Sequence, residues 1–291
     1  MNVEDSIERC VSCNTPLDSY ITNWLYKCKR CGLENSLLYN DQINGKDPIG
    51  WTESANDFLE ELRERNARSI LEELSIYAEL KSKKLLDIGC AAGWFLGVAK
   101  NYHMSVIGVE PEKNIAEKAI KKGLDIRTVI FPDETLNNKK FDVITFNDVF
   151  EHIKHPDRML EQVSSQLDDN GYLILNLPSS NGVIYKLSCL LARFSYISPL
   201  ERLWQKGYFS PHLYYYSHRN LAELVQKKGF KLISKNRLDV IQIKGLWNRI
   251  NHNKSMNIAC AIIAYCSIVI AYPILKYLLP SDIMFHIYQK S

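Results

Sequence analysis

The sequence lacks a marked excess of charge of either sign. It has 36 Lys and Arg residues against 33 Asp and Glu residues, which leaves a formal net charge of +3 at pH 7. Folded domains that bind nucleic-acid phosphates usually have basic clusters and a pI above ~9, whereas the pI here is about 8.3. The composition therefore argues against a nucleic-acid partner and fits a small-molecule or membrane-adjacent substrate better.

The chain also lacks an apolar run at its beginning and any visible internal repeat. Residues 1–9 (MNVEDSIER) contain no hydrophobic stretch of the kind that a secretory signal needs. We therefore expect a cytoplasmic protein whose eight cysteines are reduced. The 46% hydrophobic and 24% charged residues are typical of a folded chain, and the length allows one large domain with appendages or two small ones.

Four of the cysteines form two C-x-x-C pairs in one early block, CVSCNTPLDSYITNWLYKCKRC. These are Cys10, Cys13, Cys28 and Cys31. Two such pairs at this spacing favour Zn²⁺, because each pair can cover one edge of a tetrahedron. Asn14 and Gly32 directly follow the pairs, where a tight turn often needs a positive φ. We predict a zinc ribbon over residues 1–40, with a disulfide or redox pair as the alternative.

The pattern after the ribbon predicts an α/β fold. A polar loop over residues 40–50 leads into an amphipathic helix over Glu53–Leu80, whose charged face includes Arg63. We assign residues 41–84 to this linker and helix. Strand-like and helix-like segments then alternate, which implies a parallel sheet with right-handed crossovers. The expected strands are 84–88, 106–110, 124–129, 141–146 and 172–177, closed by an antiparallel pair, 230–235 and 238–243.

The sharpest local signal is LLDIGCAAGWFL, residues 85–96, where a strand leads through a glycine turn into a helix. The dinucleotide fingerprint G-x-G-x-x-G fails, because Ala91 and Trp94 occupy its second and third glycine positions. Asp87, just before the turn, would also repel a pyrophosphate at the helix N-terminus. A cationic nucleoside without phosphate, S-adenosylmethionine, fits this carboxylate better. Glu110 ends the next strand, where an acidic side chain can accept the ribose hydroxyls.

Four blocks in order, LLDIGCAAGWFL, VIGVEP, FDVITFNDVFEHI and DDNGYLILNLP, resemble the class I S-adenosylmethionine-dependent methyltransferases. The resemblance covers about residues 85–243 and is closest to the branch with ubiquinone-biosynthesis and glycan-tailoring enzymes, some of which also carry an N-terminal zinc ribbon. It implies a Rossmann-like seven-stranded sheet in a domain over 85–245. The implied cofactor-binding residues are Asp87, Gly89, Cys90, Ala91, Gly93, Glu110, Pro111 and Asn147. Ala91 replaces the usual middle glycine, and only Asp133 is a candidate for the acid near the adenine.

Two histidines are candidates for a general base, which an acceptor hydroxyl would need. His152 lies in NDVFEHI, where this branch commonly has a histidine, and His212 lies in the aromatic run PHLYYYSH. A purely structural role is the alternative for each. Glu151 precedes His152, but neighbours on a helix point apart, so we expect no dyad between them.

The stretch Ile258–Leu275 has no formal charge over 18 residues, nearly enough for a helix that crosses a bilayer. A spanning helix, an interfacial or re-entrant helix, and a buried core helix or protein–protein contact all remain open. We assign residues 246–291 to a hydrophobic, membrane-associated C-terminal segment and residues 182–216 to an aromatic lid, which could also meet the membrane. The segment would attach the protein to the inner face of the cell membrane.

These features predict a methyltransferase that acts at the cytoplasmic membrane face on a lipid-linked, glycan-pathway or quinone-like acceptor. Its cofactors would be S-adenosylmethionine and Zn²⁺, and the oligomeric state stays open. One alternative is a methyltransferase that grips RNA with its zinc ribbon. Another is a membrane-tethered binding module that keeps the fold without catalysis.

Overall fold

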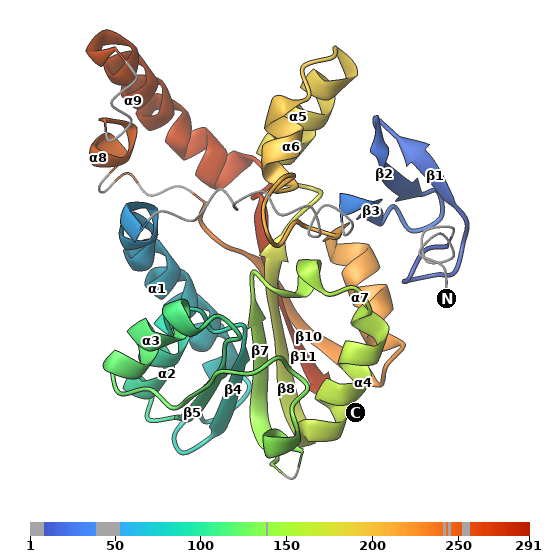
Figure 1. Cartoon of the computed structure of the whole chain (residues 1–291), viewed down its shortest axis with the longest axis vertical. Helices are drawn as coiled ribbons and strands as arrows, with labels where there is room; N and C mark the ends of the chain where they lie inside the picture. The colour runs from blue at the N-terminus through green and yellow to red at the C-terminus, as the bar shows by residue number, and fades with distance from the viewer. Residues whose placement is uncertain (1–8, 39–52, 138, 241–242, 244–245, 252–256) are drawn as a thin grey trace.

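The computed structural model describes residues 9–38, 53–137, 139–240, 243, 246–251 and 257–291 (Figure 1). The polar linker predicted over residues 40–50 lies outside the described residues. The described chain resumes with the helix that follows the linker.

A seven-stranded sheet forms the centre of the molecule, in the order β10-β11-β8-β7-β4-β5-β6 (Figure 1). Its strands are β4 (Lys84–Ile88), β5 (Ser105–Val109), β6 (Ile126–Arg127), β7 (Phe141–Asn147), β8 (Leu167–Pro178), β10 (Phe230–Arg237) and β11 (Ile283–Lys290). The strands from β8 to β6 pair in parallel, whereas β11 is antiparallel to both β8 and β10. The predicted seven-stranded Rossmann-like sheet is confirmed.

Helices cover both faces of this sheet (Figure 1). One layer contains α1 (Glu53–Ser75), α2 (Trp94–Asn101) and α3 (Lys113–Lys121), and the other contains α4 (Pro156–Gln166) and α7 (His218–Gln226). In α1 the apolar residues recur three and four positions apart, and Ile70, Leu71 and Leu74 are completely buried in a core shared with α2. The amphipathic helix predicted to cover the sheet is therefore confirmed.

The strand that closes the sheet differs from the prediction. We expected 230–235 to pair with 238–243, but β10 pairs with β11, from Phe230 opposite Lys290 to Arg237 opposite Met284. A strand between two neighbours needs a continuous run of residues that tolerate burial, and all residues from Met284 to Tyr288 are buried. The domain boundary predicted at residue 245 thus falls inside the sheet domain, and residues 238–282 are an insertion between β10 and β11.

The N-terminal ribbon is joined to the main domain through a second sheet. Its strands β1 (Leu17–Tyr20), β2 (Thr22–Cys28) and β3 (Glu34–Ser36) pair in sequence order, and β3 also pairs with β9 (Tyr214–Tyr215). The segment 182–216 forms α5 (Val183–Arg193) and α6 (Ser198–Leu203) before β9. Its buried aromatic residues pack on the ribbon: Trp204 meets Trp24 edge to face, with ring centroids 6.0 Å apart. The ribbon and the predicted lid therefore share one core.

The insertion between β10 and β11 forms α8 (Leu246–Asn251) and α9 (Ile258–Pro273), which continues as the helical turn η5 (Ile274–Leu278). The helix over residues 258–278 contains an 18-residue stretch with a mean hydropathy of 2.3 and is long and apolar enough to cross a bilayer. Only 6% of that apolar stretch is buried within the protein, and Ile263 and Ile270 are 65% and 76% exposed. A core helix buried within this chain is therefore wrong, whereas the protein–protein contact that formed part of the same alternative stays a prediction.

Candidate active site

The turn between β4 and α2 depends on its two glycines. Gly89 and Gly93 have φ values of 72° and 77°, in the left-handed region that favours glycine. A Cβ on Gly89 would lie 2.5 Å from Val149 Cγ2, and a Cβ on Gly93 would lie 2.4 Å from Leu124 Cδ1. Ala91 between them also has a positive φ, 46°. The backbone therefore bends tightly at the carboxyl end of β4, as the sequence predicted.

Three predicted cofactor residues converge at this turn. Asp87 at the end of β4 is 1% exposed, and its Oδ1 accepts a hydrogen bond from Asn147 Nδ2 of β7 at 3.1 Å. Glu110, just after β5, is 7% exposed, and its two oxygens accept hydrogen bonds from the backbone N–H groups of Ala91 and Glu112, each at 3.0 Å. Because β4, β5 and β7 are parallel neighbours, their ends bring these side chains to one edge of the sheet.

The environment of these carboxyls favours a positively charged ligand. Burial raises the pKa of Asp87 to about 8, the Asn147 hydrogen bond opposes that rise, and the charge of Glu110 adds to it. Burial also raises the pKa of Glu110, against the two backbone N–H groups that stabilise its charge. Two acids whose ionisation is suppressed in this way gain most from a nearby cation. The donor set therefore fits a sulfonium-bearing nucleoside.

Cys90 and Pro111, two further predicted cofactor-binding residues, can contribute less to cofactor binding than Asp87, Glu110 and Asn147. Cys90 is buried, and its Sγ lies where a Cβ on Gly108 would come within 2.5 Å, so its side chain faces the core beneath the turn. Pro111 is exposed directly after Glu110. Asp133 is also exposed and accepts a hydrogen bond from the Thr135 N–H at 2.9 Å, as the cap of the turn η3 (Glu134–Leu136).

Arg63 was not predicted as a site residue, because the helical pattern placed it on the charged outer face of a helix. Its guanidinium lies 4.2 Å from the ring centroid of Trp94, the first residue of α2. Burial lowers the pKa of Arg63, and the charge of Asp148 after β7 opposes that change. Arg63 therefore brings a cation from α1 to the edge of the sheet where Asp87 and Glu110 lie.

The two candidate bases lie together, although they are far apart in the sequence. The ring centroids of His152 and His212 are 4.8 Å apart. Glu151, His152 and Phe150 form the short 3-10 turn η4 (Phe150–His152), which follows β7 closely. In this turn Glu151 Oε1 is 4.0 Å from His152 Nε2 and 3.9 Å from His212 Nε2. Glu151 and His152 thus lie closer than neighbours on an α-helix, although at 4.0 Å no hydrogen bond joins them.

The four ribbon cysteines also lie together. The Sγ atoms of Cys10 and Cys31 are 3.4 Å apart, as are those of Cys13 and Cys28. All four lie within 4.8 Å of one another, without a disulfide. Sulfurs in a tetrahedral zinc site, ~2.3 Å from the metal, are about 3.8 Å apart, so the arrangement fits Zn²⁺. Asn14 and Gly32 have φ values of 58° and 74°, which confirms the predicted turns.

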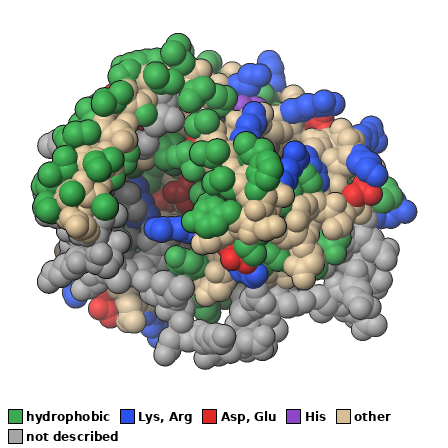
Figure 2. All heavy atoms as spheres, turned by 90° about the horizontal axis from the view of Figure 1, so that it is seen from above, with side chains coloured by type: hydrophobic (Ala, Val, Ile, Leu, Met, Phe, Trp, Pro, Cys, Tyr) green, Lys and Arg blue, Asp and Glu red, His purple; other side chains and the backbone are tan. Residues whose placement is uncertain are grey.

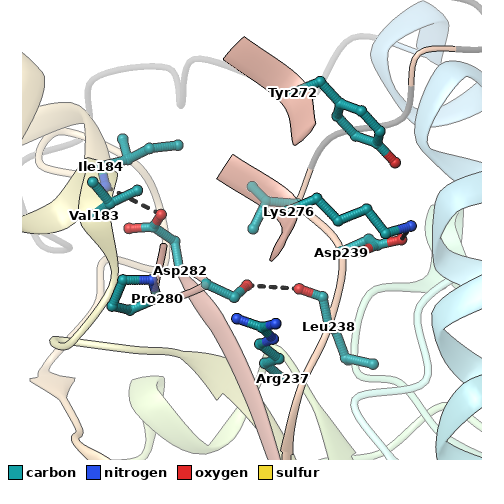
Figure 3. Close-up of a pocket in the computed structure, with 11 residues that line it drawn as sticks. Val183, Ile184, Arg237, Leu238, Asp239, Tyr272, Lys276, Pro280 and Asp282 are labelled. Atoms are coloured by element: carbon teal, nitrogen blue, oxygen red, sulfur yellow. Dashed lines mark hydrogen bonds and ion pairs between the residues drawn. The ribbon is translucent and has the colours of Figure 1, made fainter. Parts of the chain in front are cut away.

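A separate pocket lies between the start of α5 and the end of α9 (Figure 3). Its charged groups are paired within the protein: Lys276 Nζ lies 3.1 Å from Asp239 Oδ2, and Arg237 donates to the Leu279 carbonyl. Asp282 accepts hydrogen bonds from the first N–H groups of α5. These contacts anchor the two helices to the sheet, and none of the predicted site residues lines the pocket.

Comparisons with known proteins agree with this fold. Residues 58–235 match the family model described as a methyltransferase domain. The chain is 32% identical over 102 residues to a ubiquinone biosynthesis O-methyltransferase from Pelagibacter ubique, a match that covers 33% of this chain and 42% of the relative. It is 27% identical over 175 residues to a protein of the same name from Nitrobacter winogradskyi, covering 57% and 64%.

The chain thus spans less than two thirds of the length of either relative. A solved structure, the magnesium protoporphyrin IX methyltransferase from Synechocystis with bound S-adenosylhomocysteine, superposes with a TM-score of 0.51 at 12% identity, covering 85% of this chain and 90% of that one. This likeness concerns the fold. Because the family model covers more than half of the chain, the protein belongs to the class I S-adenosylmethionine-dependent methyltransferases.

Proposed function

We propose that this methyltransferase binds S-adenosylmethionine at the ends of β4, β5 and β7 and methylates a lipid-linked or quinone-like acceptor at the cytoplasmic membrane face. The observation that supports the cofactor site is the pair of buried acids, Asp87 and Glu110, beside the Gly89–Gly93 turn. The relatives named for ubiquinone biosynthesis support an amphiphilic acceptor.

Each residue of the site has a distinct part in binding. Asp87, oriented by Asn147, would face the cationic end of the cofactor, and Glu110 would accept the ribose hydroxyls with the lone pairs left free by its backbone partners. Arg63, whose guanidinium lies over the Trp94 ring at the start of α2, would face the carboxylate of the methionine part. When bound, S-adenosylmethionine supplies a methyl group that is already activated on sulfur. The protein then contributes mainly positioning and exclusion of water.

The raised pKa of Asp87 predicts that cofactor affinity depends on pH. Below its pKa of about 8 the carboxyl holds a proton, which a cationic ligand must displace. Affinity for S-adenosylmethionine should therefore rise with pH, by up to about tenfold per unit below pH 8, and then level off. Calorimetric titrations across this range, compared with Asp87→Asn, measure the effect. An equally steep profile in Asp87→Asn would show that another group titrates.

We also propose that the ribbon cysteines hold Zn²⁺ as a structural ion. The tetrad leaves no open coordination position, which is typical of structural zinc. The ribbon contacts the catalytic domain directly: Ser36 Oγ donates to the His212 carbonyl at 2.7 Å, and Glu34 accepts a hydrogen bond from the Tyr185 hydroxyl. Zinc would therefore stabilise the surroundings of the candidate active site.

The chain path argues against a bilayer-spanning α9. Strand β10 precedes the insertion and β11 follows it, and both belong to the same sheet. If α9 crossed the membrane, residues 238–257 would have to cross it in the opposite direction. That stretch contains Asp239, Lys244, Arg249 and Lys254, and the hydrocarbon tolerates neither such charges nor unpaired backbone. We propose that α9 enters one leaflet without crossing it.

A second apolar element lies at the same end of the molecule. Helix α5 starts just after β8 and, like α9, projects from the sheet edge where the parallel strands end (Figure 1). It exposes Leu187 and Leu190, 54% and 49% accessible, and the chain after it exposes Phe194 at 78%. Figure 2 views this end of the molecule, where hydrophobic side chains gather around a hollow. Lys and Arg side chains lie on the same face. Such a surface suits an anionic bilayer.

Replacing Ile270 of α9 with aspartate should lower binding to anionic lipid vesicles at least tenfold. An acidic residue costs up to about 3 kcal/mol in the bilayer relative to isoleucine. The matched control is Ile76→Asp, since Ile76 is 70% exposed against 76% for Ile270 but follows the end of α1. Vesicle co-sedimentation measures the difference. Equal binding by both variants, or none by the wild type, would contradict the membrane proposal.

Transfer of a labelled methyl group tests the function itself. The purified protein is incubated with methyl-labelled S-adenosylmethionine and separate lipid, polysaccharide and RNA extracts. We expect label in the lipid fraction. Label only in RNA would support the RNA methyltransferase instead, and absence of label despite cofactor binding would support a binding module.

A further inference from the structure

The side chain of Glu151 is the least satisfied polar group beside the proposed cofactor site. It is 0% exposed, and among the described residues neither of its carboxylate oxygens has a hydrogen-bond partner. Burying an ionised carboxylate without compensation costs several kcal/mol or more. The nearest positive candidates are His152 and His212, whose Nε2 atoms stay 4.0 and 3.9 Å from Oε1, beyond hydrogen-bond length. A proton or a cation must therefore neutralise the carboxylate, whose pKa is raised by burial.

The hydrogen bonding of His152 directs the lone pair of its Nε2 toward the Glu151 carboxylate. Its Nδ1 lies 2.9 Å from the Pro211 carbonyl oxygen, which can only accept, so Nδ1 carries the proton. In the neutral ring Nε2 is then unprotonated and faces Glu151. Histidines that bind metals commonly donate their other N–H to a backbone carbonyl in this manner.

His212 places its Nε2 atom 3.9 Å from the same Glu151 oxygen. It is 6% exposed, and the Leu203 carbonyl lies near its ring, although Nδ1 makes no hydrogen bond of ordinary geometry. Burial lowers the pKa of both His152 and His212, which favours the neutral form that metals bind. Neutral imidazoles offer lone pairs but no positive charge to Glu151, so a bound cation would compensate its carboxylate.

We propose that Glu151, His152 and His212 bind a divalent transition-metal ion, such as Zn²⁺, in a site separate from the cysteine ribbon. One ligand atom from each residue lies within 4.8 Å of the others. Ligands ~2.1 Å from a tetrahedral Zn²⁺ are about 3.4 Å apart, so small side-chain movements suffice. Two imidazoles and one carboxylate leave at least one coordination position for an oxygen of another molecule.

The position of this site connects it with methyl transfer, and this part of the inference depends on the proposed function. Glu151 and His152 follow β7 closely, and Asn147 at the end of β7 holds Asp87. An acceptor hydroxyl bound at the open position would lose its proton more easily, because a divalent cation stabilises the resulting oxyanion. The site would thus select acceptors with a hydroxyl or phenol oxygen and replace a general base.

The ribbon and the backbone hold the three ligands in place. Ser36 of β3 binds the backbone of His212 and Leu213, through its hydroxyl at 2.7 Å and its N–H at 2.9 Å. The Leu213 N–H in turn donates to the Glu151 carbonyl at 2.9 Å. These hydrogen bonds connect His212, which is distant in the sequence, with the adjacent ligands Glu151 and His152.

Metal content of the full-length protein tests the proposal independently of activity. Elemental analysis after purification in Zn²⁺ and removal of excess metal should give two equivalents per chain. Glu151→Gln and His212→Ala should each retain one. His155→Ala should retain two, because His155 is an exposed histidine of the same segment. Thermal unfolding and binding of S-adenosylhomocysteine show whether each variant is folded.

The wild-type count is decisive even if a variant fails to fold. One equivalent in the wild type, lost in Cys28→Ser, would overturn the proposal, as would two equivalents retained by folded Glu151→Gln and His212→Ala. Cobalt substitution adds a spectroscopic readout: Glu151→Gln should keep the thiolate charge-transfer bands of the ribbon ion and lose only the absorption of the second ion. Two equivalents without binding of S-adenosylhomocysteine would leave the metal site standing while the proposed function fails.

Discussion

Replacing Glu110 with alanine should lower the affinity for S-adenosylhomocysteine about 100-fold or more. The variant loses the carboxylate that we assign to the ribose hydroxyls. A hydrogen bond to a charged group contributes about 1.5–3 kcal/mol, and losing two of the weaker kind amounts to about 3 kcal/mol. The backbone N–H groups of Ala91 and Glu112, which now bind this carboxylate, also lose their partner.

The matched control for Glu110→Ala is Glu112→Ala. Glu112 is an exposed acid two positions away that contributes its backbone N–H to Glu110, and alanine keeps that N–H. Equilibrium dialysis should show nearly unchanged affinity for the control. If both variants bind like the wild type, the ribose assignment is wrong. Thermal unfolding of each variant separates loss of binding from loss of the fold.

Disrupting the ribbon by Cys28→Ser together with Cys31→Ser should reduce methyl transfer at least tenfold while changing cofactor affinity little. The tetrad would lose half of its ligands, and a small zinc domain without its metal usually unfolds. The pairing of β3 with β9 would be lost, together with the hydrogen bond from Ser36 to the His212 carbonyl. Asp87 and Glu110 lie on other strands and keep their partners.

The control for the ribbon variant is Cys260→Ser together with Cys266→Ser. Both of these cysteines are exposed on α9, outside the tetrad. Elemental analysis and the rate of methyl transfer should both match the wild type. A ribbon variant that loses its zinc but keeps full activity would show that the ribbon does not support the active site.

Features determined by neighbouring residues could be predicted from the sequence. The turn that follows Asp87 needs Gly89 and Gly93 for its own backbone geometry, so its pattern is local. The same holds for the C-x-x-C pairs, whose turns at Asn14 and Gly32 have the expected positive φ. The helix α1 was predictable because its buried residues recur with the helical period.

Features that depend on distant pairing could not be predicted in the same way. Strand β11 completes the sheet after an insertion. No pattern within residues 283–290 indicates that this strand pairs with β8 and β10. Likewise His212 reaches Glu151 through the fold, and Arg63 reaches the site only because α1 packs on α2. The close approach of Glu151 to His152 could not be predicted because the turn η4 is 3-10 rather than α-helical.

The insertion also changes the interpretation of the apolar segment. From the sequence alone, residues 258–275 suit a spanning helix as well as an interfacial one. The structure adds that β10 and β11 hold both ends of the insertion in one sheet. The choice between span and single-leaflet insertion therefore depends on topology, which hydropathy does not contain.

Calorimetric titration of the purified, folded protein with S-adenosylhomocysteine at about pH 8 tests the central claim most directly. The arrangement of Asp87, Glu110 and Asn147 predicts saturable binding of one molecule per chain. Absence of any binding heat in folded protein, at ligand concentrations well above those that saturate ordinary enzymes, would contradict a cofactor site at these strand ends.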